Sequence, residues 1–195
     1  MGTRQLLTAI WPLLGVAVLS TAGLISQASL ELVPASQMQG QWWRLISAHL
    51  GHTNSWHWLI NMLGLALFGS VFWRDIGGLR LLGLVIALML GISALLLLLV
   101  DYAYLGLSGV LYGLFVFGLL QSWRYNKWLN SAALLLLLGK VGLDSMAESN
   151  SALALSTEQL INAQIAHEAH LVGSMLAGGL FGLSWLWQAL TLRKS

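Results

Sequence analysis

Residues Leu105–Gly113 read LGLSGVLYG and decide the predicted fold, because they begin an apolar helix at a single hydroxyl group. That hydroxyl belongs to Ser108, and Gly106 and Gly109 lie on either side of it. Glycine removes side-chain bulk, so a substrate backbone can approach the serine oxygen closely. A serine hydroxyl alone is a poor nucleophile and needs a base to accept its proton. The stretch therefore raises the hypothesis of a nucleophilic serine on an apolar helix.

A histidine that could act as this base lies in a second apolar segment. His170 occurs in the run Ala169-His170-Leu171-Val172-Gly173, again close to a glycine. A serine in a membrane helix more often bonds to its own helix, whereas an ionisable residue there usually has a function. The two residues together are therefore more informative than the serine alone. We expect Ser108 and His170 to form a catalytic dyad.

The composition is that of a membrane protein. The chain has 195 residues, of which 57% are hydrophobic and 8% are charged, whereas a soluble domain has roughly 25% charged residues. It contains no cysteine, which excludes disulfides and thiolate metal sites. The net charge of +2 comes with no basic patch, so nucleic acid is not an expected partner. We expect a single all-α domain over residues 1–195, with membrane lipids around it.

Apolar runs of about 20 residues predict six membrane-spanning helices. They cover about residues 6–25, 55–73, 79–100, 107–123, 128–143 and 165–190, the last within a helix that begins near Glu158. Asn54 or Ser55 is expected to cap the second span. Residues 27–50 are expected to form an interfacial loop on the membrane, and residues 144–163 a polar loop. A cleaved signal peptide ending near Ser26 is the alternative for the first span, but the length of its apolar run favours a retained helix.

Lysine and arginine are unevenly distributed between the predicted loops. One side of the membrane would hold Arg4, Arg74, Arg80, Arg124, Lys127, Arg193 and Lys194. The other side would hold Arg44, Lys140, Glu31, Asp101, Asp144, Glu148 and Glu158. Because an excess of positive charge marks the cytoplasmic side, we predict that both termini are cytoplasmic. Ser108 and His170 then both lie towards the outer leaflet.

A second group of polar residues opens the second span. His57 and Asn61 are four residues apart and share one helix face, and His52 lies one turn earlier. Acyl transfer through a serine needs hydrogen-bond donors where the carbonyl oxygen becomes negative. We expect His52, Asn61 and the backbone N–H of Ser108 to bind this oxyanion, and His57 to shape the inner cavity. His49 has no predicted role in the site and is expected at the membrane interface.

Taken in order, these motifs resemble those of the rhomboid intramembrane serine proteases over nearly the whole chain. The resemblance rests on Trp43-Arg44, then His52, His57 and Asn61, then Gly106-Leu107-Ser108-Gly109, then Ala169-His170 with Gly173. Tyr112 matches the family tyrosine that stacks on the catalytic histidine. Ala177 stands where the family often has glycine, and alanine still permits close helix packing. The compact six-span form and the run Gly51–Asn54 look more like the bacterial rhombosortase branch.

The resemblance implies an intramembrane endopeptidase that uses the Ser108–His170 dyad and no cofactor. Its substrate would be a transmembrane anchor of an exported protein, in the rhombosortase case a C-terminal anchor that carries a Gly-Gly motif. An amine acceptor could then replace water and make the enzyme a transpeptidase. The location implied is the bacterial inner membrane, with the active site open to the periplasmic side. Oligomeric state does not follow from the sequence.

Three other functions are alternatives to a serine protease. The run His167-Glu168-Ala169-His170 is similar to a zinc motif, but its histidines are three residues apart where the motif needs four. We therefore expect no catalytic metal, and Glu168 is expected to be an exposed or interfacial charge that could orient His167. A transporter would be expected to show repeated halves, and none are visible. A non-catalytic rhomboid-like protein that binds transmembrane helices is the remaining alternative, although such relatives usually lack the serine or the histidine.

Two glycine pairs are predicted to be packing seams between helices. They are Gly109 with Gly113, and Gly178 with Gly182. Glycines four residues apart lie on one helix face and allow a neighbouring helix to approach closely.

Overall fold

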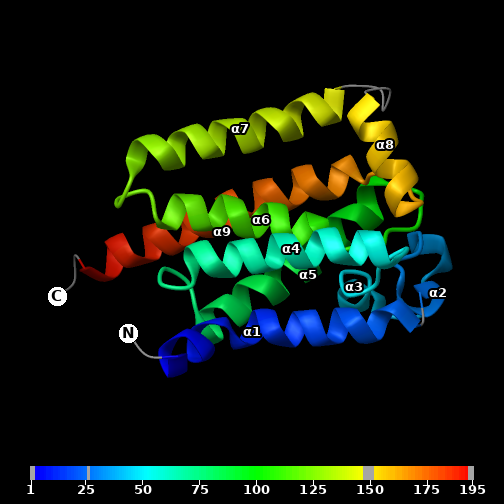
Figure 1. Ribbon diagram of the computed structural model, residues 1–195, viewed down its shortest axis with the longest axis horizontal. Helices are drawn as coiled ribbons and strands as arrows, with labels where there is room; N and C mark the ends of the chain where they lie inside the picture. The colour runs from blue at the N-terminus through cyan, green and yellow to red at the C-terminus, as the bar shows by residue number, and fades with distance from the viewer. Residues whose placement is uncertain (1–2, 26, 147–151, 193–195) are drawn as a thin grey trace.

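A computed structural model describes residues 3–25, 27–146 and 152–192, and these ranges form a bundle of helices (Figure 1). The long helices are α1 (Thr3–Ala22), α4 (Ser55–Phe72), α5 (Gly78–Leu99), α6 (Ser108–Gln121), α7 (Lys127–Met146) and α9 (His167–Leu192). The short ones are η1 (Gly23–Ile25), α2 (Gln27–Leu30), η2 (Ala35–Gln37), α3 (Arg44–Ser47) and α8 (Ala152–Ile161). No strand occurs in the described ranges, where the one β-type pairing is an isolated bridge between Leu32 and Tyr104. The all-α prediction is confirmed.

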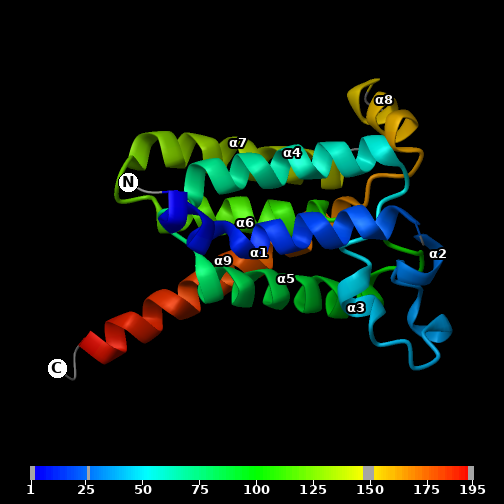
Figure 2. The ribbon, with the colours of Figure 1, turned by 60° about the horizontal axis from the view of Figure 1, so that its bottom comes forward.

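Helix α6 lies at the centre of the bundle, where it packs against α4, α5, α7 and α9. Helices α1 and α7 lie on opposite sides of this centre, and α1 begins at the same end of the bundle at which α9 finishes (Figures 1 and 2). Some residues used in the predictions lie outside the described ranges. They are Glu148, Arg193 and Lys194, which enter the predicted topology, and Ser26, at the alternative signal-peptide cleavage site.

Four helices are long and apolar enough to cross a membrane, by length and composition: α1, α4, α5 and α9. Helix α6 is apolar but has 14 residues. Helix α7 has 20 residues but includes Lys127, Lys140 and Asp144, and it is not among the four. The helices of the described chain therefore fit a membrane protein.

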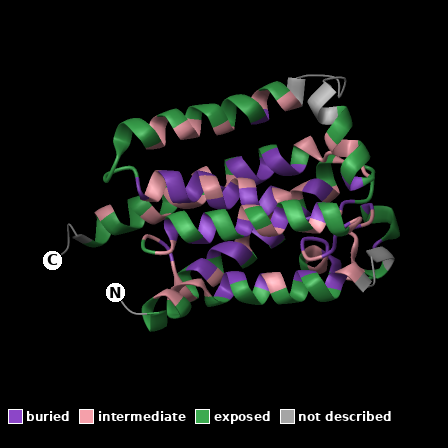
Figure 3. Cartoon of the chain, viewed as in Figure 1, coloured by how far each residue is buried: buried purple, intermediate pink, exposed green. Residues whose placement is uncertain are grey.

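Buried residues lie on the faces of the helices that point into the bundle, and exposed residues lie on the outward faces (Figure 3). The buried apolar residues concentrate on α5 and α6, and on the faces of α4 and α9 that meet them. The outward faces carry large exposed apolar side chains, among them Leu98, Leu135, Leu136, Trp185 and Trp187. Such an outer surface would be unfavourable in water and suits contact with lipid tails.

The last helix begins later than predicted. The polar segment 144–163 is not a continuous loop, because α7 extends to Met146 and α8 occupies Ala152–Ile161. The chain then turns at Asn162, whose φ of 53° breaks the helix, and α9 starts at His167. The Glu158 carboxylate stabilises this turn by accepting a hydrogen bond from the Ile165 N–H at 3.0 Å. The predicted helix start near Glu158 is therefore wrong, since a side chain that bonds the backbone competes with helix continuation.

The loop between α1 and α4 folds into short helices rather than a simple extended segment. Arg44 anchors it, since its guanidinium is buried and donates to the Glu31 carbonyl at 2.6 Å and to Gln41 Oε1 at 2.5 Å. Trp42 and Trp43 remain exposed, as expected for aromatic residues at a membrane surface.

His49 is a buried structural residue and is not at an exposed interface as predicted. Its side chain is 0% exposed, and its Nε2 lies 2.9 Å from both the Met89 carbonyl and Ser93 Oγ. A carbonyl can only accept, so Nε2 carries the proton; Ser93 Oγ in turn donates to the Leu45 carbonyl at 2.8 Å. His49 thus joins the end of α3 to the middle of α5, a long-range contact that local sequence does not reveal.

Acid is expected to destabilise the fold through the buried loop histidines. Burial lowers the pKa of His49 to about 4, and burial followed by the nearby His57 lowers the pKa of His52 to about 3. In the unfolded chain these histidines bind protons near pH 6.5. The free energy of unfolding is therefore unaffected by them above about pH 6.5, and it decreases as the pH falls towards 4. The thermal midpoint in detergent should therefore fall between pH 7.5 and 4.5. His49→Gln keeps an N–H donor but cannot titrate, so the thermal midpoint of this variant should fall less than that of the wild type over the same pH range. An equal fall would show that protonation of His49 does not destabilise the fold.

Candidate active site

The turn before α6 places Ser108 as the first residue of that helix. Gly106 has a φ of 142°, a conformation that other residues rarely adopt, and a Cβ there would lie 2.8 Å from His57 Cε1. The turn is held by two contacts with the loop before α4. The Gly106 N–H donates to the Ala48 carbonyl at 2.8 Å, and Leu32 and Tyr104 exchange two backbone hydrogen bonds of 2.9 Å. Glycine is therefore required at position 106 both by backbone conformation and by space.

Helices α6 and α9 approach each other through small residues. A Cβ on Gly109 would lie 2.8 Å from the Ala169 carbonyl oxygen, and one on Gly113 would lie 2.8 Å from the Gly173 carbonyl oxygen. A Cβ on Gly173 would collide with the Gly109 carbonyl oxygen. The predicted seam at Gly109 and Gly113 is confirmed.

The second predicted seam is wrong. Cβ atoms built on Gly178 and Gly182 meet no heavy atom within 4 Å in the described part of the chain. Ala177 is completely buried and the ring of Phe181 packs on that of Phe117 of α6, so α9 still contacts the bundle here, but through residues beside these two glycines. Spacing alone therefore identifies a helix face that permits close packing, but not whether another helix lies against that face.

This close approach brings Ser108 and His170 together. His170 Nε2 lies 2.9 Å from Ser108 Oγ, and His170 is 7% exposed. The Tyr112 ring, one turn beyond the serine, stacks on the imidazole with ring centroids 4.2 Å apart and planes 17° from parallel. The stacking holds the orientation of the imidazole, so Nε2 remains directed at the hydroxyl.

Helix α4 contributes Asn61 to the same region. Asn54 caps this helix, since its Oδ1 accepts from the His57 N–H at 2.8 Å, as the sequence predicts. Two turns in, the Asn61 side chain is 2% exposed and donates one Nδ2 hydrogen to the His57 carbonyl at 3.0 Å. A cavity of about 250 Å³ is lined by Ser108, Asn61, Tyr112 and apolar residues that include Leu111 and Phe115. The second Nδ2 hydrogen of Asn61 is therefore the one that can serve a group bound in this cavity.

His57 and His52 lie behind this cavity and are not among the residues that line it. The His57 ring packs against Gly106, and its Nδ1 lies 3.0 Å from Thr53 Oγ1. The His52 ring is completely buried against His57, with centroids 5.1 Å apart, and neither of its ring nitrogens has a hydrogen-bond partner among the described residues. The structure thus brings His57 to the turn that carries Ser108 and places His52 one layer further away.

A family model, that of the rhomboid domain, matches residues 39–188, a range that includes Asn61, Ser108 and His170. The chain belongs to the rhomboid family. A search of curated proteins finds no match. Family membership and the apolar helices together make this rhomboid a multi-pass membrane protein.

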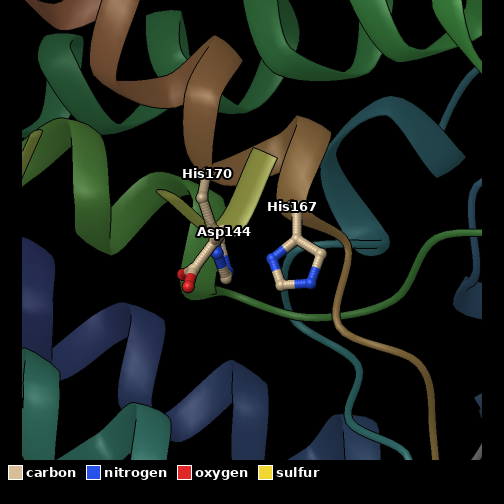
Figure 4. Close-up of side chains that lie close together, drawn as sticks. All are labelled: Asp144, His167 and His170. Atoms are coloured by element: carbon tan, nitrogen blue, oxygen red, sulfur yellow. The ribbon is translucent and has the colours of Figure 1, made fainter. Parts of the chain in front are cut away.

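Sequence reasoning missed an acidic residue beside His170 of this rhomboid. Asp144, on α7, lies beside His167 and His170 of α9, and the possible ligand atoms of the three residues are all within 4.8 Å of one another (Figure 4). An ion pair with Lys140, one turn earlier on α7, orients the Asp144 carboxylate. The i, i+4 spacing of Lys140 and Asp144 was visible in the sequence, but it indicates a helix face and not its neighbour.

Glu168 of this rhomboid is exposed, as expected, but it does not serve His167 through any described hydrogen bond. Its carboxylate accepts from the Tyr102 hydroxyl at 2.6 Å. This contact ties the first turn of α9 to the segment between α5 and α6. Burial, and then the Glu168 carboxylate, raise the pKa of Tyr102 above its ordinary value, so the hydroxyl remains a donor.

Proposed function

We propose that this rhomboid is an intramembrane serine endopeptidase in which Ser108 is the nucleophile and His170 is the general base. The observation that carries the proposal is the 2.9 Å separation of His170 Nε2 and Ser108 Oγ, two residues that are 62 positions apart in the chain. Such a distance is within the range of nucleophile and base in a hydrogen-bonded pair. Rhomboid family membership supports the same class of enzyme.

The reaction proceeds in two steps. Neutral His170, with its proton on Nδ1, accepts the Ser108 proton at Nε2 as Oγ forms a bond to the peptide carbonyl carbon. The tetrahedral intermediate collapses, the C–N bond breaks, and the same Nε2 proton passes to the departing amine. Water then loses a proton to Nε2 and attacks the acyl-enzyme carbonyl. The bond to Ser108 Oγ breaks, Nε2 returns the proton to Oγ, and the product leaves with a new carboxyl group.

The oxyanion is stabilised chiefly by Asn61 and by the backbone at the start of α6. The first N–H groups of a helix have no intrahelical partner, and the Ser108 N–H is among them because α6 begins at this residue. The Asn61 amide lines the cavity with Ser108. His52 supports the site indirectly, by packing against His57, since it does not line the cavity.

We also propose six membrane spans in one domain over residues 1–195, with α6 and α7 as the two spans beyond the four identified by length and hydropathy. The distribution of lysine and arginine supports cytoplasmic termini and an active site that opens to the periplasmic side of a bacterial inner membrane. The substrate class is the transmembrane anchor of an exported protein. The rhombosortase-like motifs favour a C-terminal anchor preceded by Gly-Gly, with water or an amine as the acceptor.

The function is tested with purified protein in liposomes and a reporter that carries a C-terminal Gly-Gly transmembrane tail. Wild-type protein should cut the reporter within or next to the tail, and Ser108→Ala should reduce the rate to background without a change in thermal midpoint. A reporter with Leu-Leu in place of Gly-Gly tests the substrate class separately. Cleavage that persists in Ser108→Ala would place the nucleophile elsewhere.

Asn61→Ala is expected to lower the cleavage rate by about 10- to 1,000-fold, the range expected from single oxyanion donors in soluble serine proteases. The effect should be on kcat, because the oxyanion exists in the transition state and not in the bound substrate. His52→Ala should lower kcat by less than Asn61→Ala. An unchanged kcat in Asn61→Ala would refute its role as an oxyanion donor.

A further inference from the structure

A cluster of possible metal ligands includes His170 of the dyad and two further residues that have no part in the reaction described above. It consists of Asp144 on α7 with His167 and His170 on α9, and Figure 4 shows the carboxylate and both imidazoles directed towards a common region. His170 uses Nε2 to contact Ser108. Its Nδ1 and the Nδ1 of His167 are buried and have no hydrogen-bond partner within the described ranges. Two free imidazole nitrogens beside one carboxylate form a donor set that accommodates a cation.

The donor set and its spacing fit zinc. Zinc prefers imidazole nitrogen and carboxylate oxygen at about 2.0–2.2 Å in a tetrahedral arrangement, which places neighbouring ligand atoms roughly 3.4 Å apart. One possible ligand atom of each residue lies within 4.8 Å of those of the other two, so side-chain rotations can bring the three to the distances that zinc requires. A fourth position remains for water, because Asp144 and His167 are both partly exposed.

One neighbouring charge opposes a bound cation. The Lys140 ammonium pairs with Oδ2 of Asp144, and Oδ1 has no hydrogen-bond partner within the described part of the chain. Because like charges repel, the lysine lowers the affinity of the cluster for a cation. The site is therefore suited to a regulatory ion that binds and leaves, more than to a permanent structural one.

We propose that Asp144, His167 and His170 form a zinc-binding site whose occupancy inhibits the enzyme. A neutral imidazole has one proton, and a metal bound at Nδ1 of His170 requires that proton to be on Nε2. Nε2 then donates and cannot accept the Ser108 proton, so the base is lost while the dyad geometry remains. The inhibition, but not the binding, rests on the proposed protease function.

Zinc binding is tested in Ser108→Ala protein, so that the result does not depend on activity. Competition with a chromophoric zinc indicator should show one zinc ion per chain. His167→Ala and Asp144→Asn in that background should each weaken binding by at least about 10-fold. The matched control is Glu168→Gln. Glu168 is next to His167 but is hydrogen-bonded to Tyr102, so this variant should bind zinc with the affinity of the Ser108→Ala parent. Equal affinity in all four proteins would overturn the site.

A gain of affinity provides a second test that loss of folding cannot imitate. Lys140→Met removes the ammonium that competes for the Asp144 carboxylate and should tighten zinc binding by about 10-fold, the size expected for one partly exposed charge. Weaker or unchanged binding in Lys140→Met would contradict the role of Asp144 as a ligand.

Inhibition is measured on wild-type protein by the rate of Ser108 labelling with a fluorophosphonate probe. Zinc should slow labelling, a chelator should restore it, and His167→Ala should label at the basal rate with or without zinc. Zinc that binds to the cluster without slowing the labelling would overturn the inhibitory role. If Ser108 does not label even in the presence of chelator, the proposed function fails, while the binding measurement still decides the site.

Discussion

His170→Ala is expected to reduce substrate cleavage by about 10,000-fold or more. The substitution removes the atom that accepts the Ser108 proton, and general base catalysis together with activation of the nucleophile contributes factors of this size. The thermal midpoint should change little by comparison, because α6 and α9 pack through Gly109, Gly113 and Gly173 and not through the imidazole. The measurement is single-turnover cleavage by folded, monodisperse protein.

Two variants separate catalysis from packing in this experiment. His167→Ala removes an imidazole one turn earlier on the same helix and should keep the wild-type rate in the presence of a chelator. Tyr112→Phe keeps the ring that stacks on His170 at 4.2 Å and should also remain active, whereas Tyr112→Ala should not. Near-normal cleavage by His170→Ala would remove the dyad from the mechanism.

Gly173→Ala is expected to damage both the fold and the reaction, although it adds only one methyl group. The new Cβ would collide with the carbonyl of Gly109 on α6. The two helices must separate to relieve this overlap, at a cost of about 1–3 kcal/mol. Ser108 is on α6 and His170 is on α9, so separation of the two helices also separates the two residues. A displacement of about 1 Å can cost ~100-fold in rate. We expect a lower thermal midpoint and a strongly reduced kcat.

Gly178→Ala is the matched control on the same helix. It adds the same methyl group where no described heavy atom lies within 4 Å of the new Cβ. Alanine is favoured over glycine in a helix by up to about 1 kcal/mol, so the midpoint should stay constant or rise, and the rate should not change. If Gly173→Ala and Gly178→Ala behave alike, close packing of α6 on α9 does not position the dyad.

Features governed by local rules could be predicted from the sequence. The Asn54 cap follows from the preference of helix N-termini for short polar side chains, and the structure contains its hydrogen bond to His57. The start of α6 at Ser108 and the small-residue seam at Gly109 and Gly113 were predicted on similar grounds, and both are present. Each depends on residues within one or two turns of each other.

Features that depend on a distant neighbour could not be predicted. Gly178 and Gly182 have the spacing of a seam, but α9 contacts α6 in this region through Phe181, and no described heavy atom lies near the two glycines. His49 finds its partners on α5, 40 and 44 residues away. Asp144 lies in a segment predicted to be a loop, and its position beside His167 and His170 results from the extension of α7 to Met146.

The most direct test of the central proposal is covalent labelling of purified wild-type and Ser108→Ala protein with a fluorophosphonate probe, in the presence of a metal chelator. The dyad predicts labelling of the wild type at Ser108, identified by peptide mass spectrometry, and no labelling of Ser108→Ala. Absence of labelling in a well-folded wild type would contradict an activated serine and would favour a non-catalytic rhomboid that binds transmembrane helices.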